Sequence, residues 1–306
     1  MTDERGRFRG ALLGLACGDA VGTSVEFKTR GTFRPLEDMI GGGTFQLRAG
    51  DWTDDTSMAL CLARSLVETG RFDPRDQIDR YVRWWREGYL SSSGRCFDIG
   101  TATEAALERF CASGDPYSGS TDPQTSGNGS LMRLAPVPMF FAPDAGRAIR
   151  FSAESSRTTH GSVEALDACR LFGAMLARAL AGADREAILG ATADPETGQA
   201  PLSPKIEAIA RGGYRAKSER EIRGAGYVVL SLEAALWSFA TTDSFRDAIL
   251  RAANLGDDAD TTAAICGQIA GAYYGEAEIP ASWRAKLALR ELIEETADAL
   301  REARPA

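Results

Sequence analysis

The sequence contains few of the residues that build transition-metal sites or membrane spans. It has a single histidine, His160, and none of its six cysteines stands in a C-x-x-C pair. A zinc site made from cysteine and histidine therefore does not fit this chain. No run of about 18 apolar residues appears, so we expect no membrane-spanning helix. The charged N-terminus lacks the apolar core of a signal peptide and the thiols are not in redox or metal motifs, so we expect a cytoplasmic protein.

Positive charge is also in short supply. The chain carries 35 Lys and Arg against 43 Asp and Glu, which gives a formal net charge of -8. A surface this acidic argues against non-specific binding to nucleic acid or to an anionic membrane, and we expect neither as a partner. It does not exclude a small anionic ligand held in a locally polarised pocket. We expect the protein to act as a monomer.

Strand-like alternation is scarce as well, whereas apolar residues recur at helical spacing along most of the chain. Near the N-terminus Gly10, Gly14 and Gly18 lie four residues apart, on one side of a helix, and such small residues let a second helix approach closely. No long linker or break in composition divides the chain. Residues 1–306 are therefore predicted to form a single compact all-α domain of many helices in an orthogonal arrangement. The segments with the clearest helical pattern are 57–68, 75–87, 102–111, 163–180, 226–239, 245–253, 261–274 and 283–302.

Two acidic clusters precede apolar helical segments that are far apart in the chain. They are Trp52-Thr53-Asp54-Asp55-Thr56-Ser57 and Gly256-Asp257-Asp258-Ala259-Asp260-Thr261-Thr262. Asp and Thr are common helix caps, so capping is the simple interpretation of either cluster alone. Capping needs only one short oxygen side chain, however, and each cluster supplies several carboxylates that repel one another unless a cation compensates. Their oxygens are hard ligands suited to Mg²⁺, Mn²⁺ or Ca²⁺, so two such helix N-termini facing each other would hold one or two ions.

Four further segments have two interpretations each. Glu26 follows a predicted helix stop at Gly22 and is either paired at the surface or part of a site. Asp98 is a helix cap or a site residue. The segment Gly127-Asn128-Gly129-Ser130 is an ordinary loop or a cradle of backbone N–H groups for a phosphate. His160 is a hydrogen-bonded core or surface residue or a catalyst, and because it is the only histidine, acid–base chemistry must rest mainly on carboxylates or metal-bound water.

Taken together, these segments resemble the ADP-ribosylglycohydrolase family, which includes the dinitrogenase-reductase-activating glycohydrolases and the ADP-ribosyl-acceptor hydrolases. Each piece is short, but their order and rough spacing agree across about residues 8 to 285, and the ordered set is specific. The family is all-α, in agreement with the helical periodicity. The matching pieces are Gly14-Leu15-Ala16-Cys17-Gly18-Asp19-Ala20 with Glu26, Thr53-Asp54-Asp55-Thr56, Asp98-Ile99-Gly100, Gly127-Asn128-Gly129-Ser130-Leu131-Met132-Arg133, Thr159-His160 and Asp258-Ala259-Asp260-Thr261-Thr262.

The resemblance implies a hydrolase that uses two Mg²⁺ or Mn²⁺ ions to release ADP-ribose from a modified protein. It implies catalytic roles for Glu26, Asp98, Asp55 and Asp258, with Glu26 beside or bound to the ions and Asp98 at the position of an important Asp in arginine-specific members. Asp257 departs from the Gly-Gly-Asp that is common in the family. By position, the metal ligands are Thr53, Asp54, Asp55, Asp258, Asp260 and Thr261, and the ADP-ribose contacts are Gly127, Asn128, Gly129 and Ser130, with His160 and Tyr227 at the rim of the pocket.

The acceptor and the catalytic state stay open at this level. Family members act on ADP-ribosyl-arginine, ADP-ribosyl-serine or O-acetyl-ADP-ribose, and Asp98 favours arginine. A non-catalytic ADP-ribose-binding or structural relative would be free to lose the acidic set, which is complete here. A metal phosphohydrolase would instead cut the diphosphate and release AMP. In the hydrolase, the ions would orient the ribose and activate water while Glu26 or Asp98 moves protons.

Overall fold

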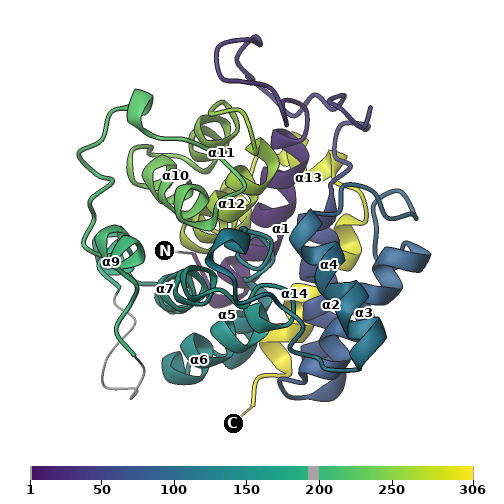
Figure 1. Ribbon diagram of the computed structural model, residues 1–306. Coiled ribbons are helices and arrows are strands. Elements are labelled where there is room, and N and C mark those ends of the chain that lie inside the picture. Colours follow the sequence, from purple (N-terminus) through teal and green to yellow (C-terminus); the bar gives the residue numbers. More distant parts are fainter. Residues whose placement is uncertain (1, 192–199, 306) are drawn as a thin grey trace.

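The computed structural model describes residues 2–191 and 200–305, and most of this part of the chain is helical (Figure 1). The predicted all-α fold is confirmed, since β structure within the described residues is limited to isolated bridges. The helices are α1 (Glu4–Gly22), α2 (Asp54–Thr69), α3 (Pro74–Glu87), α4 (Thr101–Ser113), α5 (Pro136–Phe141), α6 (Ala145–Arg157), α7 (Val163–Leu180), α8 (Arg185–Leu189), α9 (Pro204–Ala210), α10 (Val228–Ala240), α11 (Phe245–Ala253), α12 (Ala259–Tyr274), α13 (Ala281–Lys286) and α14 (Arg290–Glu302).

Helix α1 packs against α12 along its stripe of glycines. A Cβ atom on Gly14 would lie 2.2 Å from the carbonyl oxygen of Gly267, and one on Gly18 would lie 2.1 Å from that of Ala263. The pairing runs in opposite directions along the two helices, so they are antiparallel, and the end of α1 meets the beginning of α12. The prediction that this stripe admits a second helix is therefore confirmed.

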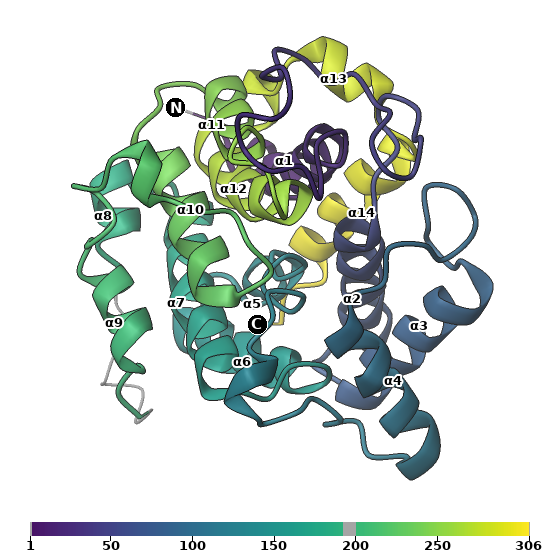
Figure 2. The ribbon, with the colours of Figure 1, turned by 45° about the horizontal axis from the view of Figure 1, so that its top comes forward.

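The α1–α12 pair occupies the middle of the molecule. Helices α10 and α11 lie on one side of it and α2, α3 and α4 on the other, in both views (Figures 1 and 2). Apolar side chains from all of these layers join one core, in which Trp52, Trp84 and Trp283 are almost completely buried. The N-termini of α2 and α12 are thereby held at a fixed distance by rigid packing.

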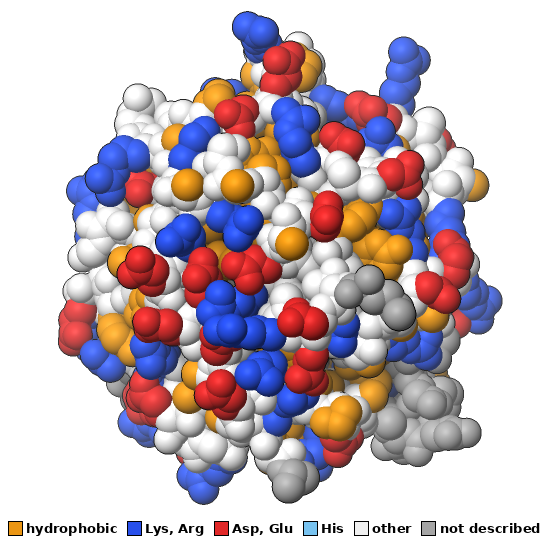
Figure 3. Space-filling view, turned by 180° about the vertical axis from the view of Figure 1, so that it is seen from behind, with side chains coloured by type: hydrophobic (Ala, Val, Ile, Leu, Met, Phe, Trp, Pro, Cys, Tyr) orange, Lys and Arg blue, Asp and Glu red, His pale blue; other side chains and the backbone are white. Residues whose placement is uncertain are grey.

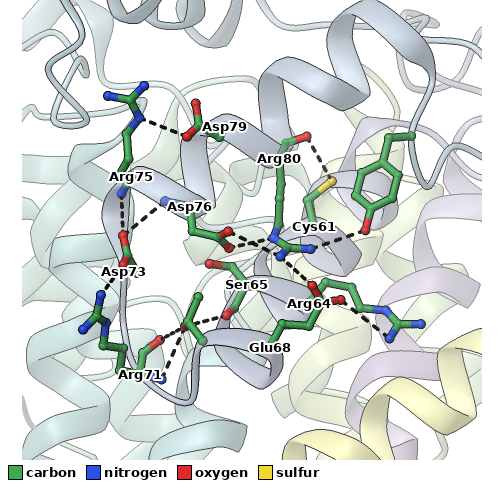
Figure 4. Close-up of polar contacts among 12 residues, drawn as sticks. Cys61, Arg64, Ser65, Glu68, Arg71, Asp73, Arg75, Asp76, Asp79 and Arg80 are labelled. Atoms are coloured by element: carbon green, nitrogen blue, oxygen red, sulfur yellow. Dashed lines mark hydrogen bonds and ion pairs between the residues drawn. The ribbon is translucent and has the colours of Figure 1, made fainter.

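Helix α2 is also tied to α3 on the outer side (Figure 4). Arg80 of α3 donates from Nη2 to Glu68 of α2 at 2.7 Å and from Nε to Asp76 at 2.7 Å. The thiol of Cys61 on α2 donates to the carbonyl oxygen of Arg80 at 3.6 Å. These contacts fix the body of α2, whose first turn carries part of the first acidic cluster.

The surface has no dominant sign of charge on the face shown in Figure 3, where acidic and basic side chains are interspersed. All six cysteines are free thiols, and four of them are buried. Across the part of the chain that the structure describes, no helix combines the length and apolar character needed to cross a membrane.

Two details of the predicted helices are wrong. The segment 283–302 is not one helix but parts of α13 and α14, which are separated at Leu289, where φ is 51°. The short helices α8 and α9 lie outside the predicted segments, and so do α5 and α6. Helix α5 begins with Pro136 and contains Pro138, and proline in a sequence usually indicates that a helix is interrupted. The buried face of α6 consists largely of small residues such as Ala148 and Ser152, so its apolar periodicity is weak.

Candidate functional site

The two acidic clusters meet in space, as the sequence predicts. Thr53 precedes α2 and Asp258 precedes α12, with Asp55 and Asp260 in the first turns of these helices. The hydroxyl of Thr53 lies 3.2 Å from Oδ2 of Asp55 and 3.4 Å from Oδ2 of Asp260. The hydroxyl of Thr261 reaches the same Asp55 oxygen at 3.5 Å. Residues about 200 positions apart therefore form one site between two helix N-termini.

Simple capping does not explain either cluster. Neither Thr53 nor Asp258 makes a side-chain capping hydrogen bond to its own helix. The cap of α2 comes instead from Asp19 of α1, whose Oδ1 accepts from the backbone N–H and hydroxyl of Thr53, both at 2.9 Å. Oδ2 of Asp19 accepts from the hydroxyl of Thr56 at 2.6 Å and from its backbone N–H at 3.1 Å. Thr53 and Asp258 are therefore not needed as helix caps, and the carboxylates of the clusters remain available to bind a ligand.

Glu26 and Asp98 approach the same centre from two loops. The loop of Glu26 is joined to the second cluster by backbone hydrogen bonds from Phe27 to Asp257 at 2.7 Å and from Asp257 to Lys28 at 2.8 Å. Asp98 sits just before α4 with φ of 55°, a left-handed conformation that is uncommon for a residue with a side chain. Carboxylate oxygens of Glu26, Asp98 and Asp260 all lie within 4.8 Å of one another. The left-handed backbone of Asp98 is typical of positions where the surrounding structure fixes a side chain in place.

Close packing of these carboxylates disfavours their charged forms. Burial raises the pKa of Glu26 to about 9, and neighbouring carboxylates, first that of Asp98, add to the rise. Burial likewise raises the pKa of Asp98 to about 7. The pKa values of Asp54, Asp55 and Asp260 are raised well above their ordinary range by burial and then by neighbouring carboxylates. A site of this kind has a strong electrostatic demand for positive charge.

The donor atoms fit divalent cations. Glu26 Oε2, Asp55 Oδ1 and Asp260 Oδ1 are buried and have no hydrogen-bond partner in the described part of the chain. Two groups of carboxylates are close enough to share an ion, one of Asp19, Asp55 and Asp260 and one of Glu26, Asp98 and Asp260. Asp19 already accepts two hydrogen bonds at each oxygen, which fills its lone pairs. The remaining ligands are hard oxygens, which suit Mg²⁺, Mn²⁺ or Ca²⁺.

A cavity of about 720 Å³ opens onto this cluster. A cavity of this size accommodates a nucleotide-sized ligand. Besides Glu26, Asp54, Asp98, Asp258, Asp260 and Thr261, its wall includes Gly100 to Thr103 at the start of α4 and the exposed Asp257 at its mouth. Asp257, which departs from the family's Gly-Gly-Asp, therefore lines the same cavity as Asp258 and Asp260. Among the described residues of the wall there are six carboxylates and no Lys or Arg.

The glycine-rich segment forms another part of the wall. Gly127 and Gly129 lie against the ring of His160, since a Cβ atom would come within 3.1 Å of Nε2 at Gly127 and within 2.8 Å of Cε1 at Gly129. The backbone N–H groups of Gly129 and Ser130 have no acceptor within the described residues. Free backbone donors of this kind bind anionic oxygens.

The structure places three of the predicted ligand contacts differently from the others. Asn128 lines the cavity, but its amide donates to Asp258 at 2.6 Å and to Ser231 at 2.8 Å, so it braces the second acidic cluster. The side chain of Ser130 is buried and accepts from Ser156 at 2.8 Å, outside the cavity wall. Tyr227 is also outside the wall. Its backbone pairs with Gly127 and its hydroxyl contacts Glu164 and Lys205.

Sequence reasoning assigned no role to several residues of the site. Asp19 was part of a motif, yet its hydrogen bonds to α2 were not foreseen. Its signal is a carboxylate on an otherwise apolar helix face, which requires partners when buried. Phe27 and Met132 also line the cavity. They had no distinguishing signal, because apolar residues at such positions are ordinary core or surface residues.

Comparison with known proteins gives a consistent result. The profile of the ADP-ribosylglycohydrolase family matches residues 1–306. The chain is 47% identical over 294 residues to ADP-ribosylarginine hydrolase Tri1 of Pseudomonas putida, covering 96% of this chain and 77% of the relative. It is 31% identical to ADP-ribosyl-[dinitrogen reductase] glycohydrolase of Rhodospirillum rubrum, covering 93% and 91%.

A solved structure supports the same assignment. A chain described as an ADP-ribosylglycohydrolase-related protein complex superposes with a TM-score of 0.87 at 44% identity, covering 99% of both chains. The fold, the paired acidic helix N-termini and these matches agree. This chain belongs to the ADP-ribosylglycohydrolase family and is a hydrolase of the glycosidic bond to ADP-ribose.

Proposed function

We propose that this protein releases ADP-ribose from modified arginine side chains of proteins, with the help of two Mg²⁺ or Mn²⁺ ions. The observation that carries the proposal is the convergence of two acidic helix N-termini whose buried carboxylate oxygens lack partners and adjoin a nucleotide-sized cavity. The choice of arginine is supported by relatives named ADP-ribosylarginine hydrolase, at 47% and 45% identity over 96% and 98% of this chain.

The proposed ligands of the ions are those that the family resemblance implied, with Glu26 beside them. They come from both helix N-termini and are already gathered around Thr53, Asp55 and Asp260 by contacts of 3.5 Å or less. When bound, the ions would supply positive charge, orient ribose hydroxyls and lower the pKa of a water. The proposed ligands are Thr53, Asp54, Asp55, Asp258, Asp260 and Thr261.

Glu26 and Asp98 are the residues that we propose for proton transfer. In the hydrolysis, the bond from C1″ of the distal ribose to the guanidine nitrogen breaks, and a water oxygen bonds to C1″. One proton of that water ends on the leaving nitrogen, so that the protein regains an unmodified arginine side chain as its guanidinium cation. Two carboxylates with raised and different pKa values, about 9 and about 7 in the metal-free protein, can divide the acid and base roles between them.

The acceptor side of the cavity also suits a guanidinium group. Glu26, Asp98 and Asp257 line it, and the wall described here has no Lys or Arg to repel a cation. The diphosphate is proposed to lie along the glycine-rich part of the wall, at Gly127 and Gly129, where the backbone N–H of Gly129 is unpaired among the described residues. This arrangement separates the recognition of the anionic and cationic ends of the substrate.

The remaining proposals concern the context of the enzyme. Residues 1–306 are proposed to act as a single catalytic domain, as a monomer, in the cytoplasm. Support for the single domain comes from the family profile that matches the whole chain. The proposed substrate is an ADP-ribosylated protein and the product is free ADP-ribose.

The test is release of ADP-ribose from an arginine-linked and a serine-linked peptide, each with Mg²⁺, with Mn²⁺ and with a chelator. We expect release from the arginine linkage that the chelator abolishes. Release from the serine linkage alone would contradict the proposed acceptor. Tight binding of ADP-ribose without release from either peptide would contradict the proposed catalysis and favour a non-catalytic ADP-ribose-binding protein.

A further inference from the structure

A positive charge lies buried behind the glycine-rich part of the cavity wall. The guanidinium of Arg133 is fully buried, and its hydrogen-bond partners among the described residues are uncharged side chains, those of Met58, Thr158 and Thr159. Its Cζ lies 4.4 Å from the centre of the Tyr81 ring, and its Nε has no acceptor. Burying a charge without a counter-charge is strongly unfavourable, so the hydrogen bonds that Arg133 does make must compensate for part of the lost hydration.

The principal hydrogen bond of Arg133 leads to the histidine of the cavity. Nη2 of Arg133 donates to Oγ1 of Thr159 at 2.6 Å, and the same Oγ1 lies 2.9 Å from Nδ1 of His160. Arginine can only donate, so Thr159 accepts on that side. The Thr159 hydroxyl hydrogen has no other acceptor among the described residues, and burial makes an unused donor costly. The hydroxyl therefore donates to Nδ1, which places the ring proton of a neutral His160 on Nε2.

The Nε2 edge of this ring lies at the cavity wall. It sits against Gly127 and Gly129, and His160 lines the cavity although its side chain is otherwise buried. Nε2 has no hydrogen-bond partner within the described residues. Together with the unpaired backbone N–H of Gly129, an Nε2–H would form a pair of donors on one part of the wall. Donors in this arrangement suit anionic oxygens of a diphosphate.

Electrostatics favours the same arrangement. The described cavity wall carries six carboxylates and no cationic side chain, so a diphosphate benefits from positive charge in addition to that of the proposed ions. Arg133 provides it from behind the wall, through Thr159 and His160. Burial, and then the charge of Arg133, lowers the pKa of His160 to about 3, which keeps the ring neutral at physiological pH. A neutral ring with a fixed proton remains a donor to the ligand over a wide pH range.

We propose that Arg133 is a positioning residue that acts through Thr159 to hold His160 as a neutral ring with its Nε2–H directed at an anionic oxygen of the bound diphosphate. The proposal deepens the proposed function, because it takes ADP-ribose as the ligand of the cavity. The state of the ring, however, is a property of the protein without ligand and can be measured separately.

The test uses the fact that His160 is the only histidine of the chain. In protein labelled with ¹⁵N-histidine, correlation spectra of the imidazole nitrogens report one ring. We expect a neutral ring with the proton on Nε2 that does not titrate between pH 5 and pH 8. A ring protonated on Nδ1, or one that becomes charged within this range, would overturn the proposal.

Two variants of Thr159 separate positioning from general structure. Thr159→Val removes the hydroxyl and keeps the side-chain shape, whereas Thr159→Ser keeps the hydroxyl. We expect the valine variant to lose the preference for Nε2–H and to bind ADP-ribose at least about tenfold more weakly by calorimetry, the effect of one hydrogen bond to a charged group. The serine variant should retain both properties. Arg133→Met is a second variant, expected to show the same loss, but it removes a large buried side chain and need not fold.

The outcomes also distinguish this proposal from the proposed function. An unchanged ring and unchanged ADP-ribose affinity in Thr159→Val would overturn the role of Arg133 and Thr159 while leaving the hydrolase assignment in place. If wild-type protein failed to bind ADP-ribose although its ring had the Nε2 proton, the proposed ligand would be wrong. In that case the link from Arg133 to His160 would stand, but its direction toward a diphosphate would not.

Discussion

The carboxylate of Asp19, near the end of α1, accepts hydrogen bonds from both the backbone N–H and the hydroxyl of Thr53 at 2.9 Å. One residue of the central helix pair thereby determines where α2 begins. Thr56 supplies two more hydrogen bonds to the other oxygen of Asp19. The first acidic cluster is thus positioned by a residue that has no free lone pair for a metal ion.

We predict that Asp19→Asn destabilises the protein by about 1–3 kcal/mol, because an amide group would face two donors of Thr56 and leave them unpaired. The free energy of unfolding in urea measures the effect. Asp243→Asn is the control, since the Asp243 side chain is fully exposed and its loss should change stability by no more than about 0.5 kcal/mol. Equal stability of the two variants would contradict the capping role of Asp19.

Removing one carboxylate from either helix start should abolish turnover. We predict that Asp54→Asn and Asp258→Asn each lower the rate of ADP-ribose release at least about 100-fold. Mutating residues that only hydrogen-bond to metal ligands already lowers activity by up to about 100-fold, and loss of a ligand should cost at least as much. Binding of Mn²⁺ should weaken in parallel, while circular dichroism should show an intact helical fold.

Asp257→Asn is the matched control for Asp258→Asn. The two residues are adjacent, but the side chain of Asp257 is exposed at the cavity mouth, whereas Asp258 accepts from Asn128 at 2.6 Å beside α12. We expect Asp257→Asn to keep its affinity for Mn²⁺. Full activity in both Asp54→Asn and Asp258→Asn would remove the assignment of the metal site.

Metal removal should make stability depend on pH. The folded, metal-free protein holds protons on Glu26, with a pKa of about 9, and on Asp98, with a pKa of about 7, whereas the unfolded chain releases them near the ordinary values of 4.5 and 3.8. The folded state therefore binds more protons, and stability falls as pH rises through these raised pKa values. We predict that the chelated protein is less stable in urea at pH 8.5 than at pH 6.5, and that added Mg²⁺ stabilises it more at the higher pH.

Glu26→Gln tests the origin of that dependence. The glutamine cannot titrate, so the chelated variant should lose less stability between pH 6.5 and pH 8.5 than the chelated wild type. An identical loss in both proteins would show that Glu26 does not carry a raised pKa. His160 contributes little to the change in stability between pH 6.5 and pH 8.5. Its pKa is lowered in the folded protein, so its protonation affects stability mainly below pH 6.5, the pKa of histidine in the unfolded chain.

Much of the fold follows from local patterns in the sequence. The helical period predicted all of α7 and α11, and the small-residue spacing of Gly10, Gly14 and Gly18 predicted a close helix partner. The pattern does not say which helix that partner is, because the complementary glycines Gly267 and Gly271 lie about 250 residues away. Apolar continuity also does not reveal the break at Leu289, which requires a left-handed backbone in a residue that rarely adopts it.

The acidic clusters could be predicted from the sequence as a candidate site, because they contain more carboxylates than helix capping needs. The contacts that position them were not. Asp19 meets Thr53 and Thr56 across 34 and 37 residues, and Arg133 meets Thr159 across 26, so no local pattern contains these pairs. The sequence also does not show where the side chain of Ser130 points, since a serine hydroxyl in a glycine-rich segment can bind a ligand or a neighbouring residue equally well. Here its hydroxyl serves Ser156.

The contact between α1 and α12 offers a last test of how packing supports the site. A Cβ atom at Gly14 would lie 2.2 Å from the backbone oxygen of Gly267, and neither helix backbone can yield without shifting its neighbours. We predict that Gly14→Ala lowers the free energy of unfolding by at least about 1–3 kcal/mol, the usual cost of overpacking. Gly100→Ala, where nothing lies within 4 Å of the new Cβ and φ is -66°, should be close to neutral in the same urea experiment. Because α1 also carries Asp19, Gly14→Ala should weaken Mn²⁺ binding as well. Unchanged Mn²⁺ affinity in a destabilised Gly14→Ala would mean that the metal cluster is held by α2 and α12 without the position of α1.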